Sequence, residues 1–234
     1  VRQLLQGYGI SRPVFVVPSG IDLDRFSGET DPIRQAVLRQ SLDIPQEHLI
    51  LVSVGRLAEE KNLEELLHLR AAMGEAPVTL LLVGGGPDKL RLEGIAAGLG
   101  LTAPAVVFAG MVPPAQVPDW YQLGDLFVSA STSETQGLTY IEALAAGVPA
   151  LCRADPCLAG VIREGENGWQ YRDREEFQQK LTEIRRQPEQ LAEMSAAARR
   201  SMQTFSIHAF AEHMESIYLS QMDHHGGGRQ EVSA

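Results

Sequence analysis

Short, almost continuously apolar segments recur along the first two thirds of the chain, and longer segments with helical spacing lie between them. The apolar segments lack the alternation of polar and apolar residues that marks a half-exposed strand. Such segments are typical of strands in a parallel sheet that is covered on both faces. Six strands are expected, over Val14–Pro18, Leu49–Val54, Val78–Val83, Ala105–Ala109, Leu126–Ala130 and Val148–Cys152.

Between these strands, the helical spacing predicts helices over Leu63–Met73, Pro87–Gly98, Val117–Leu123 and Leu138–Ala146. Strands that alternate with helices indicate a doubly wound, Rossmann-like α/β domain with a parallel sheet. After Trp169 the pattern changes to helices alone, over Arg174–Gln187, Pro188–Thr204 and His208–Met222. In open α/β sheets ligands bind beyond the carboxyl ends of the strands, and the polar segments of this chain fall there.

The composition fits a globular protein and limits its ligands. With 234 residues, 44% of them hydrophobic and 21% charged, the chain is long enough to bury a substantial core. Its net charge of −10 argues against a broad surface for nucleic acid or an anionic membrane, because both are polyanions. No apolar run reaches the roughly 18 residues of a membrane-spanning helix. Cys152 and Cys157 fit thiols in a reducing cytoplasm better than a disulfide framework or a zinc site.

Two cations follow the second expected strand, in the segment SVGRLAEEKN. Gly55 turns the chain, and Arg56 and Lys61 come before the next helix. Arginine supplies a planar fork of donors and lysine a mobile point charge, so together they predict a phosphate pocket. The alternative is that both are surface charges that pair with the neighbouring Glu59 or Glu60.

Three glycines, Gly84, Gly85 and Gly86, directly follow the third expected strand. Glycine lets the backbone turn sharply and lets a ligand approach the main chain. A dinucleotide fingerprint needs a further glycine where Lys89 stands, and an acidic residue about twenty positions later. We therefore do not expect NAD binding, and a purely structural turn remains an alternative.

The segment SETQGLTYIEALAAGVP places Glu134 before a helix and Glu142 inside it. Gly137 permits close approach of a ligand, and the first turn of the helix exposes N–H groups that favour a phosphate. Carboxylates accept hydrogen bonds from hydroxyl groups, so two of them flanking a phosphate predict a nucleotide sugar. An acidic helix start explains Glu134 equally well, but it does not explain Glu142 among apolar residues.

In combination, these motifs resemble the donor-binding half of retaining glycosyltransferases of group 1 type, whose GT-B fold has two Rossmann-like domains. The resemblance rests on the two cations, the glycine turn, the segment FAGMV and the two glutamates. The segment VVPSGIDLDRF is also similar, although Ser19 stands where asparagine is commoner. The match covers about residues 14–205. Within it, SETQGLTYIEALAAGVP is most similar to the glycosyltransferases that attach glucose to diacylglycerol.

The resemblance implies roles for individual residues. Arg56 and Lys61 would hold the donor diphosphate and stabilise the charge that develops on the leaving nucleotide. Glu134 would bind the donor hexose, and Glu142 the ribose hydroxyls. Arg56, Lys61 and Glu134 are thus the expected catalytic residues. The other expected donor-binding residues, with the base near Met111 and Val112, are Gly55, Gly84, Gly85, Met111, Val112, Gly137, Leu138 and Thr139.

Metal-independent binding is expected, with no cofactor beyond the donor. Two cations already lie at the phosphates, which removes the need for a metal ion. Asp22 and Asp24 resemble the Asp-x-Asp metal motif of other glycosyltransferases, but they lie far along the chain from the phosphate residues. We therefore expect a structural role for them.

The resemblance also implies an acceptor-binding domain before this region, which nothing ahead of Val14 can supply. Since the chain begins with Val1 and not Met, we expect a part of a longer protein that binds donor but transfers poorly alone. The expected organisation is a donor-binding domain over residues 1–205, a crossover helix over 206–222 and a disordered tail over 223–234. An exposed apolar face of that helix would favour self-association.

Two functional interpretations share this pocket. In the first, the chain belongs to a hexosyltransferase that transfers glucose from UDP-glucose to a hydroxyl acceptor, with diacylglycerol as the expected acceptor. That protein would be cytoplasmic and peripheral at the inner membrane face, and would act in glycolipid biosynthesis. In the second, the chain is a stand-alone module that binds a nucleotide sugar or phosphate without transferring anything.

Overall fold

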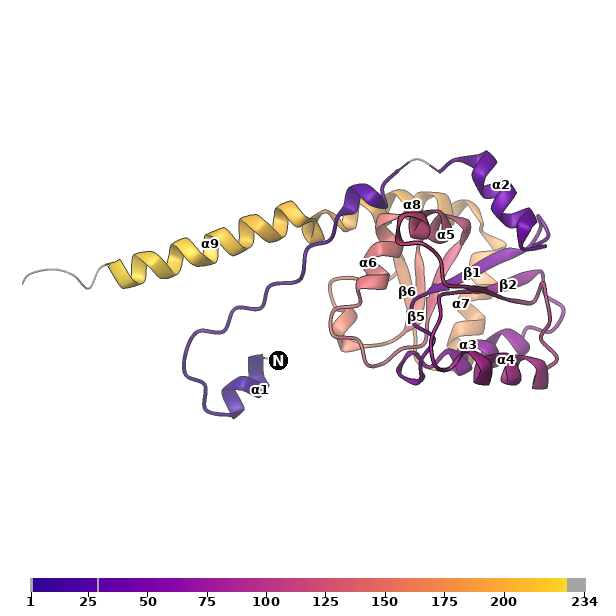
Figure 1. Cartoon of the computed structure of the whole chain (residues 1–234), viewed down its shortest axis with the longest axis horizontal. Coiled ribbons are helices and arrows are strands. Elements are labelled where there is room, and N and C mark those ends of the chain that lie inside the picture. The colour runs from indigo at the N-terminus through magenta and orange to yellow at the C-terminus, as the bar shows by residue number, and fades with distance from the viewer. Residues whose placement is uncertain (1, 29, 227–234) are drawn as a thin grey trace, which may run out of the picture. The chain divides into compact units, whose positions relative to one another are not determined.

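The computed structural model describes residues 2–28 and 30–226. By its contacts the chain forms two compact units, a larger one over Leu23–Met202 and a smaller one formed by the two ends of the chain (Figure 1). The predicted domain limits at residues 205 and 222 stay a prediction. None of the helices in the described residues is both long enough and apolar enough to cross a membrane.

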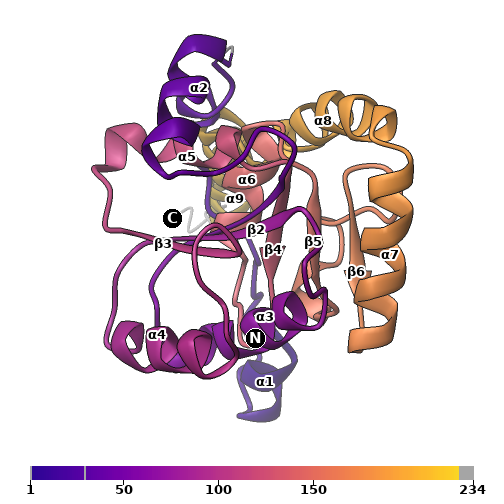
Figure 2. The ribbon, with the colours of Figure 1, turned by 90° about the vertical axis from the view of Figure 1, so that its right-hand side faces the viewer.

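A wholly parallel, six-stranded sheet lies at the centre of the larger unit (Figure 2). Its strand order is β3-β2-β1-β4-β5-β6. The strands are β1 (Leu49–Val54), β2 (Val78–Val83), β3 (Val106–Gly110), β4 (Leu126–Ser129), β5 (Ala150–Arg153) and β6 (Gly168–Tyr171). In register, Leu51 of β1 lies beside Leu80 of β2 and Leu126 of β4, all buried. The predicted doubly wound α/β fold is confirmed.

Helices cover both faces of this sheet. One face carries α3 (Leu63–Ala71), α4 (Lys89–Gly98) and α7 (Arg174–Arg186), whose apolar side chains share one core with β1 and β2. The other face carries α5 (Val117–Leu123), α6 (Leu138–Ala145) and α8 (Glu189–Ser201), and α2 (Pro32–Ser41) packs against α5 (Figure 2). Both faces being covered explains why the strands are apolar almost throughout.

Some predicted elements are wrong or were missed. Val14–Pro18 forms no strand. The strand β6 was missed because it is only four residues long and reads Gly-Trp-Gln-Tyr, without an apolar run. The helix α2 was also missed, although Asp31 caps its first turn by accepting hydrogen bonds from two backbone N–H groups.

The smaller unit contains α1 (Arg2–Gly7), the segment up to Asp22 and α9 (Ile207–Gly226). Ile21 joins its two stretches, because its N–H donates to Phe205 O at 2.9 Å and its carbonyl accepts from Ile207 N at 3.0 Å. The helix α9 extends beyond its predicted end at residue 222, and the part of the predicted tail over 227–234 lies outside the described residues.

Side chains of α9 remain exposed on part of its predicted apolar face. Ile207 and Tyr218 are 50% and 63% exposed, and Leu219 and Met222 are exposed as well. Self-association through this helix stays a prediction.

One buried cation ties α3 to the strand that follows it. The guanidinium of Arg70 donates to the carbonyl oxygens of Gly74 (2.8 Å), Val78 (2.9 Å) and Ala76 (3.4 Å). Arg70 is only 3% exposed, and of the three carbonyl groups that of Val78 belongs to a buried residue as well. The bonds fix the start of β2, whose far end leads to the Gly84–Gly86 turn.

We expect Arg70→Met to lower the free energy of unfolding by about 2–3 kcal/mol, because the carbonyl groups lose their donor while the apolar stem remains. The matched control is Arg186→Met, at an exposed position of α7, which should change that free energy by less than about 0.5 kcal/mol. Urea unfolding followed by circular dichroism measures both. Equal effects of the two substitutions would contradict the role assigned to Arg70.

Candidate functional site

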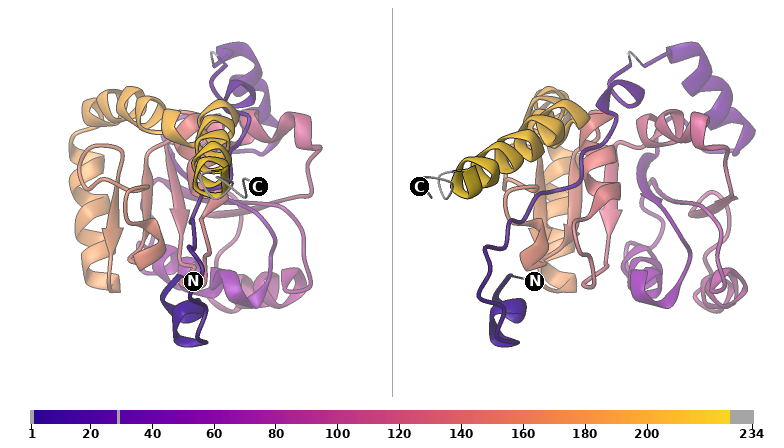
Figure 3. Two further views of the ribbon diagram at one scale, coloured as in Figure 1. Left: turned by 90° about the vertical axis from the view of Figure 1, so that its left-hand side faces the viewer. Right: turned by 60° about the vertical axis from the view of Figure 1, so that its left-hand side comes forward.

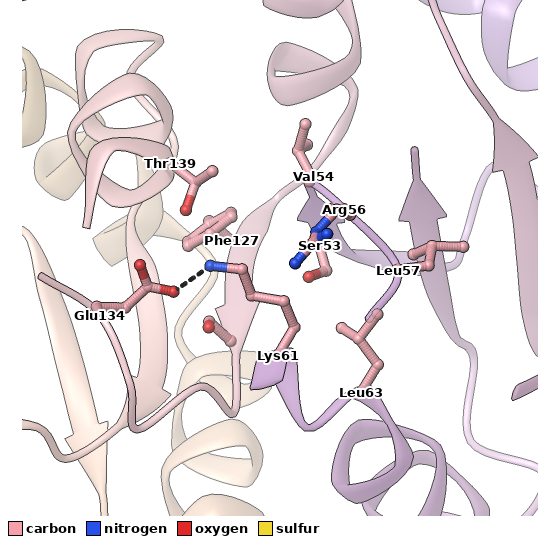
Figure 4. Close-up of a pocket in the computed structure, with 11 residues that line it drawn as sticks. Ser53, Val54, Arg56, Leu57, Lys61, Leu63, Phe127, Glu134 and Thr139 are labelled. Atoms are coloured by element: carbon pink, nitrogen blue, oxygen red, sulfur yellow. Dashed lines mark hydrogen bonds and ion pairs between the residues drawn. The ribbon is translucent and has the colours of Figure 1, made fainter. Parts of the chain in front are cut away.

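The candidate site lies at the topological switch point of the sheet, between β1 and β4. The chain places β2 and β3 on one side of β1, and then β4 on the other side. Such a switch point leaves a crevice beyond the carboxyl ends of the strands. The side chains that line the hollow there come from the ends of β1 and β4, the segments after them and the start of α6 (Figure 4): Ser53, Val54, Gly55, Arg56, Leu57, Lys61, Leu63, Phe127, Ser129, Glu134 and Thr139.

The hollow brings together some of the predicted site residues but not all of them. Those that line it are Gly55, Arg56, Lys61, Glu134 and Thr139. The others lie outside its lining: Gly84, Gly85, Met111, Val112, Gly137, Leu138 and Glu142. Their predicted roles are not tested by this lining alone, because a nucleotide sugar is much longer than the hollow.

An ion pair crosses the hollow. Lys61 Nζ donates to Glu134 Oε1 at 2.6 Å, and the two side chains are 28% and 11% exposed (Figure 4). Partial burial means that salt screens this contact less than it screens an exposed surface pair. The alternative that Lys61 pairs with an adjacent glutamate is wrong in this structure, since its partner follows β4.

Arg56 is arranged differently. Its guanidinium donates to Glu60, and its side chain is 65% exposed, as the surface alternative predicted. The hydrogen bond from Arg56 holds the pKa of Glu60 below its ordinary value. An exposed pair of this kind is weak and exchanges readily with water, so the guanidinium is available to an incoming anion.

The segments that carry Lys61 and Glu134 are tied to one another. The carbonyl oxygen of Glu60 accepts hydrogen bonds from Ser131 Oγ at 3.3 Å and from Ser133 Oγ at 3.2 Å. Next to Lys61, Asn62 has a φ of 48° and donates to Glu65 Oε2 at 2.7 Å. Asn62 Nδ2 also donates to Ala130 O at 3.4 Å. This bond and those from the two serines link the segment after β1 to the segment after β4.

The glycines after β2 allow two main chains to touch. A Cβ at Gly84, whose φ is 136°, would lie 1.9 Å from Gly55 O, and a Cβ at Gly86 would lie 2.2 Å from Leu57 O. These close approaches support the structural-turn interpretation for both positions, and donor binding at Gly84 stays a prediction. Gly85 instead faces Met111, because a Cβ there would lie 2.7 Å from Met111 Cγ. Met111 is 86% exposed, and base stacking near it stays a prediction.

The helix α6 begins at the hollow. Gly137 precedes it with a φ of 71° and contributes no side-chain cap. The N–H of Tyr140 already donates to Gly137 O at 3.0 Å, whereas the N–H groups of Leu138 and Thr139 begin the helix and have no acceptor within it. Thr139 in that turn lines the hollow. The start of α6 therefore offers backbone donors and the positive end of a helix dipole near Lys61.

Glu142 lies one turn deeper in α6 and has the partner that a buried carboxylate requires. Tyr121 Oη donates to Glu142 Oε2 at 2.8 Å. Burial raises the pKa of Glu142, while the hydrogen bond from Tyr121 and the charge of Arg25 lower it. Burial, and next the charge of Glu142, raise the pKa of Tyr121 well above its ordinary value, so its hydroxyl remains a donor.

Sequence reasoning missed several residues around the site. Ser53 and Ser129 line the hollow, and Ser129 Oγ accepts a hydrogen bond from Tyr140 Oη at 2.7 Å. Both serines interrupt apolar strands at their carboxyl ends, which is a signal that could have identified them. Tyr121 and Arg25 gave no such signal, because their link to Glu142 depends on how distant segments pack.

No metal centre is evident in the described residues. They contain no group of three or more His, Cys, Asp or Glu side chains that could hold a metal ion. Asp22 and Asp24 are both exposed. Metal independence stays a prediction.

Comparison with known proteins gives the family. Residues 34–201 match the family described as glycosyl transferases group 1. Alpha-monoglucosyldiacylglycerol synthase of Acholeplasma laidlawii is 33% identical over 212 residues, which cover 89% of this chain and 53% of the synthase. The synthase of the same name from Streptococcus pneumoniae is 37% identical over 169 residues, with 70% and 38% covered. The chain thus spans about half the length, or less, of these curated relatives.

Solved structures show the same fold. The HepE protein of Anabaena, in complex with UDP, has a TM-score of 0.82 at 21% identity, and the alignment covers 94% of this chain and 61% of HepE. The C-terminal domain of a group 1 glycosyl transferase from Francisella tularensis has a TM-score of 0.65 at 20% identity, with 80% and 100% covered. The predicted fold, the C-terminal half of a GT-B glycosyltransferase, is confirmed. Because the family match extends over most of its length, the chain belongs to the group 1 glycosyl transferases.

Proposed function

We propose that this chain is the donor-binding domain of a retaining glycosyltransferase and binds a nucleotide-diphosphate sugar beyond the carboxyl ends of β1 and β4. One observation carries the proposal: Arg56, Lys61 and the start of α6 converge on one hollow, with Glu134 opposite Lys61. Positive charge together with the N-terminus of a helix suits a diphosphate. Group 1 membership and the UDP and UDP-glucose complexes of HepE support the same ligand class.

The ion pair determines how a donor would enter. The hollow has a volume of about 20 Å³, room for about one water molecule but not for a phosphate group. A phosphate group that enters the hollow would therefore displace Glu134 and become the new partner of Lys61. That movement frees the Glu134 carboxylate to accept hydrogen bonds from hexose hydroxyls.

The same cations would serve the transfer step. When the bond between the hexose and the diphosphate breaks, negative charge develops on the leaving nucleotide. Arg56 and Lys61 would stabilise that charge, which is the usual source of the largest catalytic effect. Glu142, inside α6, would accept hydrogen bonds from the ribose.

UDP-glucose is the proposed donor and diacylglycerol the proposed acceptor, because the relatives include monoglucosyldiacylglycerol synthases. Since the chain spans only part of those relatives, we propose that it binds donor without efficient transfer and that another domain holds the acceptor. A binding module without any transfer is the second candidate. Incubation with labelled UDP-glucose and diacylglycerol should give no glucosylated lipid; product formation would overturn the proposal that the chain is inactive alone.

Calorimetric titration of the chain with UDP, GDP, UDP-glucose and NAD tests the proposed pocket. We expect one nucleoside diphosphate to bind, UDP in preference to GDP, with the same affinity in the presence of a chelator and with no response to NAD. Silence from both diphosphates would reject a donor pocket. Loss of binding with the chelator would reject the metal-independent site.

Replacement of Lys61 should weaken the binding of UDP. Lys61→Met removes one charged hydrogen bond to the diphosphate, worth ~1.5–3 kcal/mol, so we expect about 10- to 100-fold weaker binding. Lys180→Met is the matched control, because Lys180 also forms ion pairs and is partly buried but lies outside the hollow. A similar loss of affinity in both variants would show that the effect is not specific to the pocket.

Replacement of Glu134 should change the relative affinities for UDP and UDP-glucose. In Glu134→Gln the carboxylate no longer competes for Lys61, so UDP should bind about two- to fivefold more tightly, from ~0.5–1 kcal/mol. The advantage of UDP-glucose over UDP should shrink, because the amide accepts hexose hydroxyls less strongly than a carboxylate. The ratio of the two dissociation constants measures this, and an unchanged ratio would remove the hexose role of Glu134.

A further inference from the structure

The buried hydroxyl of Tyr121 is hydrogen-bonded to the carboxylate of Glu142 in α6. Tyr121 does not line the hollow described above. Tyr121 is fully buried, with its ring centroid 6.0 Å from that of Phe26 and 6.0 Å from that of Phe127. A phenylalanine would fill this space between aromatic rings equally well. Burying a hydroxyl group is unfavourable unless it is hydrogen-bonded. The hydrogen-bond partner of Tyr121 therefore accounts for a tyrosine at this position.

That hydroxyl bonds one oxygen of one carboxylate. Its donor distance to Glu142 Oε2 is 2.8 Å, and a hydrogen bond to a charged acceptor fixes the acceptor more firmly than a neutral one. A carboxylate has two oxygens that together accept up to about four hydrogen bonds. The bond from Tyr121 to Oε2 restricts rotation of the carboxylate, and the lone pairs of Oε1 can accept a hydroxyl from a ligand.

We propose that Tyr121 is a positioning residue for nucleotide recognition: its hydroxyl orients Glu142 so that Oε1 accepts hydrogen bonds from the ribose of a nucleoside diphosphate. This inference rests on the proposed function, because it assumes that Glu142 binds the ribose. It adds a residue from α5 to a site that otherwise consists of segments after β1, β4 and the start of α6.

The groups around Glu142 also predict a change in the pH dependence of ribose binding. The groups that act on its pKa are burial, which raises it, and Tyr121 and Arg25, which lower it. Without the hydroxyl of Tyr121 the pKa of Glu142 should therefore rise further. Ribose binding needs the ionised carboxylate, so it should be lost at a higher pH in Tyr121→Phe than in the wild-type chain as pH falls.

The test compares UDP with 2′,3′-dideoxy-UDP, which lacks both ribose hydroxyls, by calorimetry between pH 5 and pH 8. Wild-type chain should bind UDP the more tightly. Tyr121→Phe should bind UDP about 5- to 30-fold more weakly, as expected for one strong hydrogen bond, and dideoxy-UDP as the wild type does. Tyr171→Phe is the control, since it removes another buried hydroxyl from a tyrosine and should leave the ratio of the two affinities unchanged.

The outcomes distinguish the proposed function, the role of Glu142 and the role of Tyr121. If wild-type chain binds neither nucleotide, the proposed function fails and the inference with it. If it binds both equally, the role of Glu142 fails. If Tyr121→Phe is folded and keeps the wild-type ratio and pH dependence, Tyr121 has only a packing role. Glu142→Ala provides a second route, because it removes both carboxylate oxygens and should abolish ribose discrimination, so that adding Tyr121→Phe should change the ratio no further.

Discussion

The site depends on one topological constraint, the change of side at which strands join the sheet after β3. Because β4 pairs with the free edge of β1, two segments far apart in the sequence leave the sheet side by side. One brings Lys61 and the other brings Glu134 and the start of α6 (Figure 3 shows the arrangement of the elements). In a sheet that grew in one direction only, helices would separate these segments, and no pocket of mixed charge would form at this edge.

Within that pocket, the carboxylate of Glu134 occupies a place that suits an anionic ligand. A lone cation in a partly buried hollow would be costly, since desolvation disfavours an uncompensated charge. The ion pair avoids this cost in the free chain. Under the proposed function, an incoming diphosphate would replace the carboxylate as the partner of Lys61, and the same two side chains would link recognition of the phosphate to recognition of the sugar.

The sequence predicted the central strands well, because continuous apolar runs between turn residues leave little ambiguity. The bounds of β1, β2 and α5 agree with their predictions, and the resemblance to glycosyltransferases located the residues at the strand ends. Prediction failed where an element depends on its surroundings. The strand β6 has no apolar run of its own and pairs along the edge of β5, whereas Val14–Pro18 is apolar and pairs with no strand.

The contacts of the site were less predictable than its members. Lys61 and Glu134 could be named from their motifs, but their pairing joins segments on different strands, and spacing in the sequence does not show it. The same is true of Glu142, whose partner lies on the neighbouring helix. A surface pair between Arg56 and a nearby glutamate, by contrast, could be predicted from the sequence, because the partners are four residues apart. Arg56 forms this pair with Glu60.

The two serine hydroxyls on the carbonyl oxygen of Glu60 have a consequence for how quickly this half of the site can respond. They join the strand-end segments into a single frame whose backbone is already ordered before any ligand arrives. Side chains that rotate on a fixed backbone do so within picoseconds to nanoseconds, whereas loop rearrangements take nanoseconds to microseconds or longer. Under the proposed function, a ligand would meet segments that are already cross-linked, so less main-chain conformational entropy would be lost on binding than in a loop without these bonds.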